Sequence, residues 1–200
     1  MNIKPKKNLN PVGYLEVWKM YPDGTRELHW EDNNVITSGL GVGIAHLFSG
    51  SGSNSIIDYQ LLNFQVGVSG NEDDFGASTF QLSSPLSTAE YQSTGSELII
   101  EEFTPIENGS LATDLSAFGR ILYTNIHKVT KTSVRFTLVI DRYSCNDLDP
   151  TTLELNEIGL FMRNPRGLDP PSPILVAYRP FTAIRKSTSF SLVFRWTLQF

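Results

Sequence analysis

The three histidines and the single cysteine are the side chains of this sequence best suited to metal binding or proton transfer. His29, His46 and His127 lie in three separate segments, and no pair of them has the HxH or HExxH spacing of a zinc site. Cys145 is the only cysteine, so it forms neither an internal disulfide nor a cysteine zinc centre. These residues therefore predict no metal site and no cofactor.

Three further patterns look like functional loops without matching one. The stretch SGSGSNS at 49–55 lacks the G-x-S-x-G pattern of a nucleophilic serine, and GLGVG at 39–43 lacks the Lys-Ser/Thr of a phosphate-binding loop. Glu72, Asp73 and Asp74 offer oxygen ligands for Ca²⁺, but they lack the spaced D-x-D-x-D-G pattern. We expect solvated loops at 49–55 and around residues 72–74, no phosphate-binding site at 39–43, and a protein that is not an enzyme.

Composition favours one β-rich domain. The chain has 200 residues, of which 40% are hydrophobic and 18% charged, with 15 Gly, 11 Pro and 12 Phe. This length fits one domain, and few charges with many turn formers and aromatics favour β structure. MNIKPKKNLNP has basic residues but no apolar stretch behind them, so we expect no signal peptide. No run of about eighteen apolar residues occurs, so we expect no membrane helix.

Charge is distributed unevenly along the chain. Residues 1–119 hold 5 Lys/Arg and 15 Asp/Glu, a net charge of −10, whereas residues 120–200 hold 11 and 6, a net of +5. Either acidic loops happen to come first, or an acidic surface of one copy meets a basic surface of the next in a head-to-tail ring. The overall charge of −5 argues against nucleic-acid binding.

Most of the chain has the two-residue periodicity of strands. Residues 1–12 lack periodicity and are expected to form an N-terminal arm, followed by one domain over residues 13–200. Hairpins are expected at 13–35, around Pro22-Asp23-Gly24, and at 120–142, around Thr130-Lys131-Thr132. Further strands are expected at 58–70, 153–163, 174–186 and 190–200, with short strand-like pieces at 79–87 and 97–106. The spacing of about ten residues predicts a mainly β, antiparallel β-sandwich of jelly-roll type.

One short helix is expected near residues 38–48. Its apolar stripe comprises Leu40, Ile44, Leu47 and Phe48, and Thr37 or Ser38 can cap its start.

The last strand has the clearest pattern of the chain. Its apolar side chains fall on every second position: Phe190, Leu192, Phe194, Trp196, Leu198 and Phe200. Successive side chains of a strand point to opposite faces, so this row predicts one wall of the core, with Arg195 and Gln199 pointing outward.

The segment Leu155–Phe200 resembles the C-terminal end of tailed-bacteriophage virion structural proteins. The resemblance comprises an N-E-[IV]-G-L-F strand, then a strand of the pattern L-[LV]-A-R-x-x-F-x-x-I-x-K, then S-x-x-L-x-[VF]-x-W-x-[IL]-x-F. The matching residues are Asn156, Glu157, Gly159, Leu160 and Phe161; Leu175, Ala177, Phe181, Ile184 and Lys186; and Ser189, Leu192, Trp196, Leu198 and Phe200. Tyr178-Arg179 departs from the pattern, which has Arg directly after Ala. NVITSGLGVGIAHLFSG at 34–50 is similar to an opening segment of such proteins.

The resemblance implies a non-enzymatic virion component of the tail, neck or baseplate, made in the host cytoplasm. Its expected partners are other copies of itself, as a homo-oligomer, and neighbouring virion proteins, with no nucleic acid and no membrane. Candidate subunit-contact residues are Lys4, Lys6, Lys7, Arg185, Lys186 and Arg195, and candidate contact loops are 49–55, 70–78 and 164–173. The alternative is a capsid decoration or a host-receptor or glycan-binding module, for which Trp18 and Trp30 are candidate stacking residues.

Overall fold

The computed structural model describes residues 11–49, 59–71, 76–91, 95–103, 106–107, 110–111, 115–146, 154–163 and 173–200. The main strands are β1 (Val12–Met20), β2 (Arg26–Ile36), β3 (Leu61–Gly67), β4 (Ile100–Phe103), β7 (Ser116–Arg120), β8 (Ile126–Thr130), β9 (Ser133–Ile140), β10 (Leu155–Met162), β11 (Ile174–Ile184) and β12 (Ser191–Gln199). β5 (Ile106–Glu107) and β6 (Ser110–Leu111) pair as a separate ribbon. The helices are α1 (Ser38–Ser49), α2 (Thr88–Tyr91) and the 3-10 turn η2 (Tyr123–Asn125).

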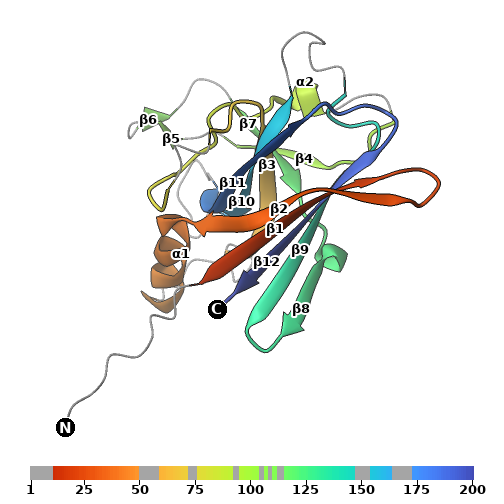
Figure 1. Cartoon of the computed structure of the whole chain (residues 1–200). Helices are drawn as coiled ribbons and strands as arrows, with labels where there is room; N and C mark the ends of the chain where they lie inside the picture. Colours follow the sequence, from red (N-terminus) through yellow and green to blue (C-terminus); the bar gives the residue numbers. More distant parts are fainter. Residues whose placement is uncertain are drawn as a thin grey trace.

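Ten strands form one antiparallel sheet in the order β4-β7-β3-β10-β11-β2-β1-β12-β9-β8, and this sheet curls into a half-barrel (Figure 1). The mainly β class and the helix near 38–48 are confirmed. The sequence did not predict α2, a single turn too short for its apolar periodicity to be recognised. The hydrogen-bonding order joins all ten strands, so a two-sheet sandwich is not established by strand pairing.

β2 is the strand that joins the two halves of the sheet. Its residues from Arg26 to Asn34 pair with β1, whereas Val35 and Ile36 pair with Tyr178 and Ala177 of β11. β11 and β12 therefore lie in the same sheet but are separated by β2 and β1. The connection from Ile184 to Ser191 therefore joins two strands that are not hydrogen-bonded neighbours.

Alternation of side chains explains the core. Leu192, Phe194, Trp196 and Leu198 of β12 are all completely buried, as predicted, whereas Phe200 is 47% exposed and lies outside the core. The cluster that contains these residues also contains Leu15 and Val17 of β1 and Phe64 and Val66 of β3. Side chains from both halves of the curled sheet thus share one core.

The two predicted hairpins are confirmed. β1 and β2 are joined by a turn in which Gly24 has a φ of +86°, a conformation that glycine adopts without steric cost. The backbone N–H and the hydroxyl of Thr25 both donate to Oδ1 of Asp23, at 2.9 and 2.7 Å. β8 and β9 are joined through Lys131 and Thr132.

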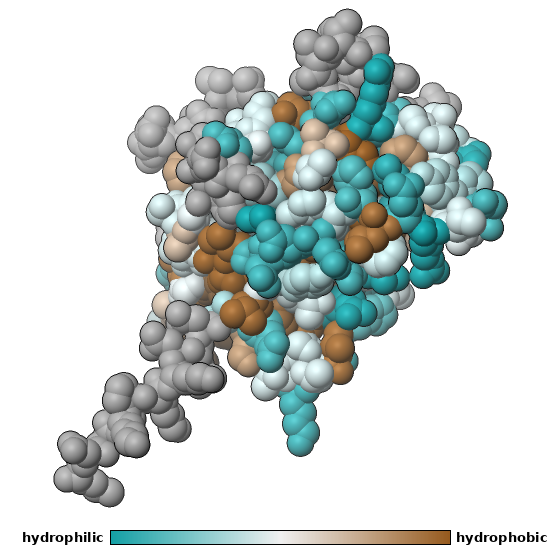
Figure 2. Space-filling model, in the orientation of Figure 1, coloured by the Kyte–Doolittle hydropathy of each residue, from teal (hydrophilic) through white to brown (hydrophobic). Residues whose placement is uncertain are grey.

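α1 docks on β11 through its first turn. The backbone N–H of Thr37 donates to the carbonyl oxygen of Val176, and the Thr37 hydroxyl donates to that of Leu175. Leu40 is buried and Ile44 packs against the same cluster, as predicted, but the stripe does not extend further, because Leu47 is 47% and Phe48 82% exposed. Figure 2 shows apolar surface in the region of α1.

The segment 79–87 was expected to form a strand and does not. Beyond a single bridge between Gly67 and Pro85, it follows an irregular path. The segment is bound instead by hydrogen bonds to the side chain of Glu157 in β10.

Candidate functional site

Asn156 and Glu157, which begin the motif of the virion-like resemblance, anchor loops to the centre of the sheet. The completely buried Glu157 carboxylate accepts hydrogen bonds from the backbone N–H groups of Ser83 (3.0 Å) and Ser84 (2.8 Å) and from the Tyr178 hydroxyl (2.7 Å). The Asn156 amide accepts from the N–H of Gly70 at 2.9 Å and donates to its carbonyl oxygen at 3.0 Å. This buried carboxylate therefore has a structural role.

Two glycines of β3 and the following loop make this anchor fit. A Cβ at Gly67 would overlap a carboxylate oxygen of Glu157, and one at Gly70 would lie 2.6 Å from the Cβ of Glu157. Gly159 fills a comparable role within β10, since a Cβ there would lie 2.7 Å from side-chain atoms of Leu175 and Leu82. Glycine at position 159 therefore permits the close packing of β10 in this region.

The histidines and the cysteine are dispersed. His29 Nε2 lies 2.9 Å from the carbonyl oxygen of Thr182, His46 is in the last turn of α1, and His127 is exposed on β8. Cys145 is buried, and burial raises the pKa of its thiol. In the described part of the chain, no group of three or more His, Cys, Asp or Glu side chains could hold a metal ion. The acidic cluster 72–74 lies outside that part.

The tryptophans are occupied by contacts within the chain. Trp196 is completely buried. The guanidinium of Arg195 lies 5.4 Å from the ring centre of Trp18, and that of Arg179 lies 5.2 Å from the ring centre of Trp30. Trp18 also donates from Nε1 to Glu16 at 3.2 Å. The two half-buried indoles thus each carry a cation on the ring.

The predicted subunit-contact residues have different surroundings. Lys4, Lys6 and Lys7 lie outside the described residues, as do most of the loops 49–55, 70–78 and 164–173. Arg185 is exposed, and Arg195 is half-exposed and lies 3.9 Å from Glu16.

Lys186 differs from the other described candidates for subunit contact, because it is only 6% exposed. Its ammonium donates to Asn146 Oδ1 at 3.2 Å and to the Ser187 carbonyl oxygen at 3.0 Å, and it lies 5.4 Å from the ring centre of Phe190. Burial lowers the pKa of Lys186 to about 8. Its long side chain therefore folds back over the core instead of pointing into solvent.

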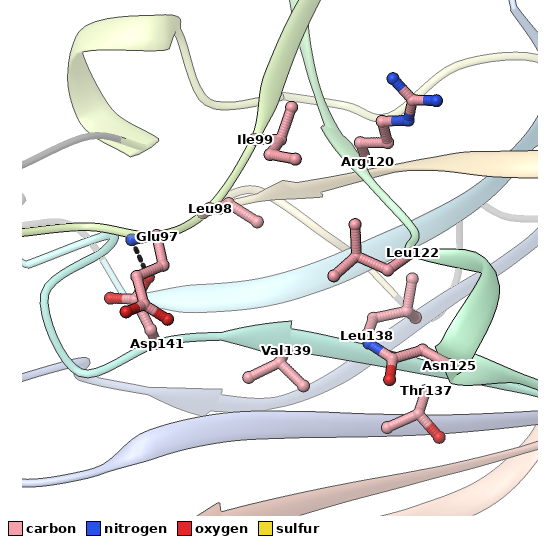
Figure 3. A pocket seen from close by; sticks show the side chains of 10 residues that line it. All are labelled: Glu97, Leu98, Ile99, Arg120, Leu122, Asn125, Thr137, Leu138, Val139 and Asp141. Carbon is pink, nitrogen blue, oxygen red and sulfur yellow. Dashed lines mark hydrogen bonds between the residues drawn. The ribbon is translucent and has the colours of Figure 1, made fainter.

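A hollow of about 150 Å³ lies beside β9 (Figure 3). Three segments that are distant in sequence line it: residues 97–99 before β4, residues 120–125 between β7 and β8, and residues 137–141 of β9 and the turn after it. Its apolar side chains are Leu98, Ile99, Leu122, Leu138 and Val139. Ile99, Leu122 and Val139 are 46%, 48% and 38% exposed, so apolar surface remains open to solvent here.

Two carboxylates lie at one end of the hollow and a cation at the other (Figure 3). Asp141 accepts from the backbone N–H groups of Glu97 (2.8 Å) and Tyr143 (2.7 Å). Burial alone would raise the pKa of Asp141, but these hydrogen bonds outweigh it and hold the pKa below its usual value. Arg120 forms an ion pair with Glu101 at 3.3 Å. The Asp141 carboxylate therefore holds the backbone at Glu97 and Tyr143 in place, and it is not tuned to act as a general base.

Size limits what this hollow can accept. Sites for small-molecule ligands usually span about 300–1,000 Å³, whereas a cavity of roughly 150 Å³ holds a group of the size of benzene. The hollow suits one apolar side chain of a partner better than a substrate.

Comparisons with known proteins found no match: no family model fits the chain, and neither a curated protein nor a solved structure matches it. None of the described helices is long and apolar enough to cross a membrane. The surfaces of the molecule itself are therefore the basis for a functional proposal.

The hollow is the feature that sequence reasoning missed. Each of its three segments looks like an ordinary strand end or loop, and no local pattern signals that they meet. The pair Glu97 and Asp141 gave no signal either, because 44 residues separate them.

Proposed function

We propose that this chain is a non-enzymatic structural component of a bacteriophage virion, assembling in several copies in the tail, neck or baseplate. The observation that carries the proposal is the use of the residues in the virion-like resemblance. Asn156 and Glu157 bind loop backbone, Gly159 permits close packing, and Trp196 and Leu198 are core residues. These residues stabilise a sheet, which supports a scaffolding role over a catalytic one.

Mass spectrometry of density-purified virions that carry this gene tests the proposal. We expect the chain at several copies per particle, measured against the major capsid protein. Absence from purified particles, with the chain present in the infected-cell lysate, would refute a virion role. If the chain is present, a reconstruction of the virion would assign it to the tail, neck or baseplate.

The alternative, a capsid decoration or a receptor or glycan-binding module, has less support. Sugar stacking needs an open aromatic face, and Arg195 and Arg179 lie on the rings of Trp18 and Trp30. Titrating the purified protein with host polysaccharide while recording tryptophan emission separates the two functions. A saturable spectral change would favour the glycan-binding module.

We also infer that the two halves of the curled sheet act as the facing layers of a β-sandwich. Supporting this, Leu15 and Val17 on one side of β2 and Phe64 and Val66 on the other belong to the same buried cluster. An experimental structure tests this through the spacing of the two halves, which is about 10 Å in sandwiches.

A further inference from the structure

We propose that the hollow beside β9 binds residues 1–10 of a second copy of this chain, which add to the sheet along the open half of β9. This inference rests on the proposed function, because it supplies the contact by which copies assemble.

The first support is the incomplete pairing of β9. β8 pairs with β9 only over Ser133–Phe136, whereas β12 pairs along the full strand from Ser133 to Ile140. The half of β9 from Thr137 to Ile140 is the half that borders the hollow. An extended segment can add to such an edge through backbone hydrogen bonds, with a neighbouring pocket for a side chain.

The second support is charge. Glu97 and Asp141 lie together at one end of the hollow (Figure 3), while Arg120 at the other end is neutralised by Glu101. Residues 1–10 contain Lys4, Lys6 and Lys7 and no Asp or Glu. A segment of charge +3 and an acidic hollow attract each other and set the register of docking.

The third support is the apolar content of the same segment. Ile3 precedes Lys4 directly, and its side chain is no larger than the hollow of about 150 Å³ can hold. We assign Ile3 to the apolar wall formed by Leu98, Leu122 and Val139. Pro5 lacks an N–H, but proline is accepted in an added edge strand whose outer side faces solvent.

Strand directions favour a second copy as the source of the segment. β1 and β9 are both antiparallel to β12, so they run in the same direction. Val12 pairs with Gln199, which pairs with Ser133, so β1 begins at the end of the sheet opposite the hollow. The chain before Val12 would have to reverse direction to reach its own hollow.

Two charge-reversal variants of the full-length chain test the proposal. One carries Lys4→Glu, Lys6→Glu and Lys7→Glu, and the other carries Glu97→Lys. Either change places like charges on segment and hollow, so each variant alone should lose self-association by at least about tenfold in sedimentation velocity at low salt. In an equimolar mixture, each segment meets a hollow of opposite charge, and association should return.

Matched controls separate docking from folding. Glu154→Lys changes an exposed carboxylate outside the hollow and should leave association unchanged. Val139→Asp should weaken association at least about tenfold, whereas Val129→Asp, at a similarly exposed valine of β8 (47% against 38%), should not. Thermal unfolding of each variant confirms that it folds.

The possible results divide clearly. If the wild-type chain associates and the mixture does not recover, or if the single reversals have no effect, this docking is wrong while multi-copy assembly stands. A wild-type chain that stays monomeric at about 100 μM also overturns the docking. Absence from virions refutes the proposed function whatever the outcome of these mixtures.

Discussion

Glu157 at the centre of the sheet and Glu97 at the hollow are both carboxylates beside a strand, but their surroundings are opposite. Glu157 is completely buried and accepts three hydrogen bonds, from two backbone N–H groups and a tyrosine hydroxyl. The Glu97 residue is exposed, and its backbone, not its side chain, bonds to Asp141.

The difference separates a region whose polar groups are satisfied within the fold from a region that leaves apolar side chains exposed to solvent. Around Glu157, polar groups of loops and strands satisfy one another inside the fold, which is what burial demands. Around Glu97, apolar side chains such as Leu122 stay half-exposed next to a strand with an unpaired edge. Exposed apolar surface rimmed by charge is typical of contact sites between proteins. The centre therefore stabilises the fold, and the hollow is the surface at which we propose that copies associate.

Substituting Glu157 and Glu97 separately by alanine should give the largest difference in the free energy of unfolding. Glu157→Ala removes the acceptor of the Ser83 and Ser84 N–H groups and of the buried Tyr178 hydroxyl, and should lower the free energy of unfolding by about 3 kcal/mol. Glu97→Ala, at an exposed position, should change it by less than about 0.5 kcal/mol. Urea denaturation at neutral pH measures both.

A conservative variant keeps this prediction testable if Glu157→Ala does not fold. Glu157→Gln retains one acceptor oxygen, so it should cost less than the alanine substitution but more than Glu97→Gln. Equal stability of Glu157→Gln and Glu97→Gln would remove the distinction between centre and hollow.

Two glycines of α1 test the same contrast between a packed position and an open one. A Cβ at Gly39 would overlap the carbonyl oxygen of Leu175, whereas a Cβ at Gly41 meets nothing within 4 Å. Gly39→Ala should therefore destabilise the protein by about 1–3 kcal/mol through overpacking. Gly41→Ala should stabilise it by up to about 1 kcal/mol, because alanine favours helix. Thermal unfolding of the pair is the measurement, and a similar loss in both would mean that α1 is not docked through Gly39.

Sequence patterns were sufficient to predict the buried face of a strand and the position of a hairpin turn, but not which strands pair with each other. Alternation along β12 identified which side chains are buried, and Pro22-Asp23-Gly24 identified a hairpin, because both signals are local. Alternation does not say which strand lies alongside: β12 pairs with β1 and β9 and not with β11, which precedes it. Pairing between distant segments depends on the whole fold.

The sites show the same limit more strongly. The hollow needs residues 97–99, 120–125 and 137–141 together, and only tertiary structure brings them together. Lys186 was expected on the surface because lysine in a turn usually is. Its long stem instead packs over Phe190, and Asn146 receives the ammonium, a contact across 40 residues.

Lys186 makes stability depend on pH. Its pKa is lowered to about 8 by burial, against about 10.4 in an unfolded chain. Between these values the unfolded chain binds more protons at this residue, so Lys186 alone should contribute a rise in the free energy of unfolding as pH increases from about 8 to 9.5. Cys145 contributes a fall from about pH 8.5 upward, because burial raises the pKa of its thiol and the unfolded chain then loses the proton first. Above about pH 10 Tyr14 adds a further fall, because the hydrogen bond to Glu31 raises its pKa to about 12.

Urea titrations at about pH 7.5, 8.5 and 9.5 test this dependence. Between about pH 7.5 and 9.5, the free energy of unfolding of Lys186→Met should rise less, or fall more, than that of the wild type, since the substitution removes the titrating group and keeps an apolar stem. Lys131→Met, at an exposed lysine of the β8–β9 turn, serves as the control and should behave like the wild type. Parallel curves for Lys186→Met and wild type would mean that Lys186 is not the source.

The smallest effect is expected on the outer face of β12. Arg195 lies over Trp18 and near Glu16, but it is half-exposed, and exposed cation–π contacts and ion pairs each contribute little. Arg195→Ala should lower the free energy of unfolding by about 0.5–1 kcal/mol and shift tryptophan emission, because water then reaches the Trp18 ring. Gln199→Ala, exposed on the same strand, should do neither. If Arg195→Ala instead abolished association without changing stability, the open surface would extend from the hollow across the sheet, since Arg195 pairs directly with Thr137 at its border.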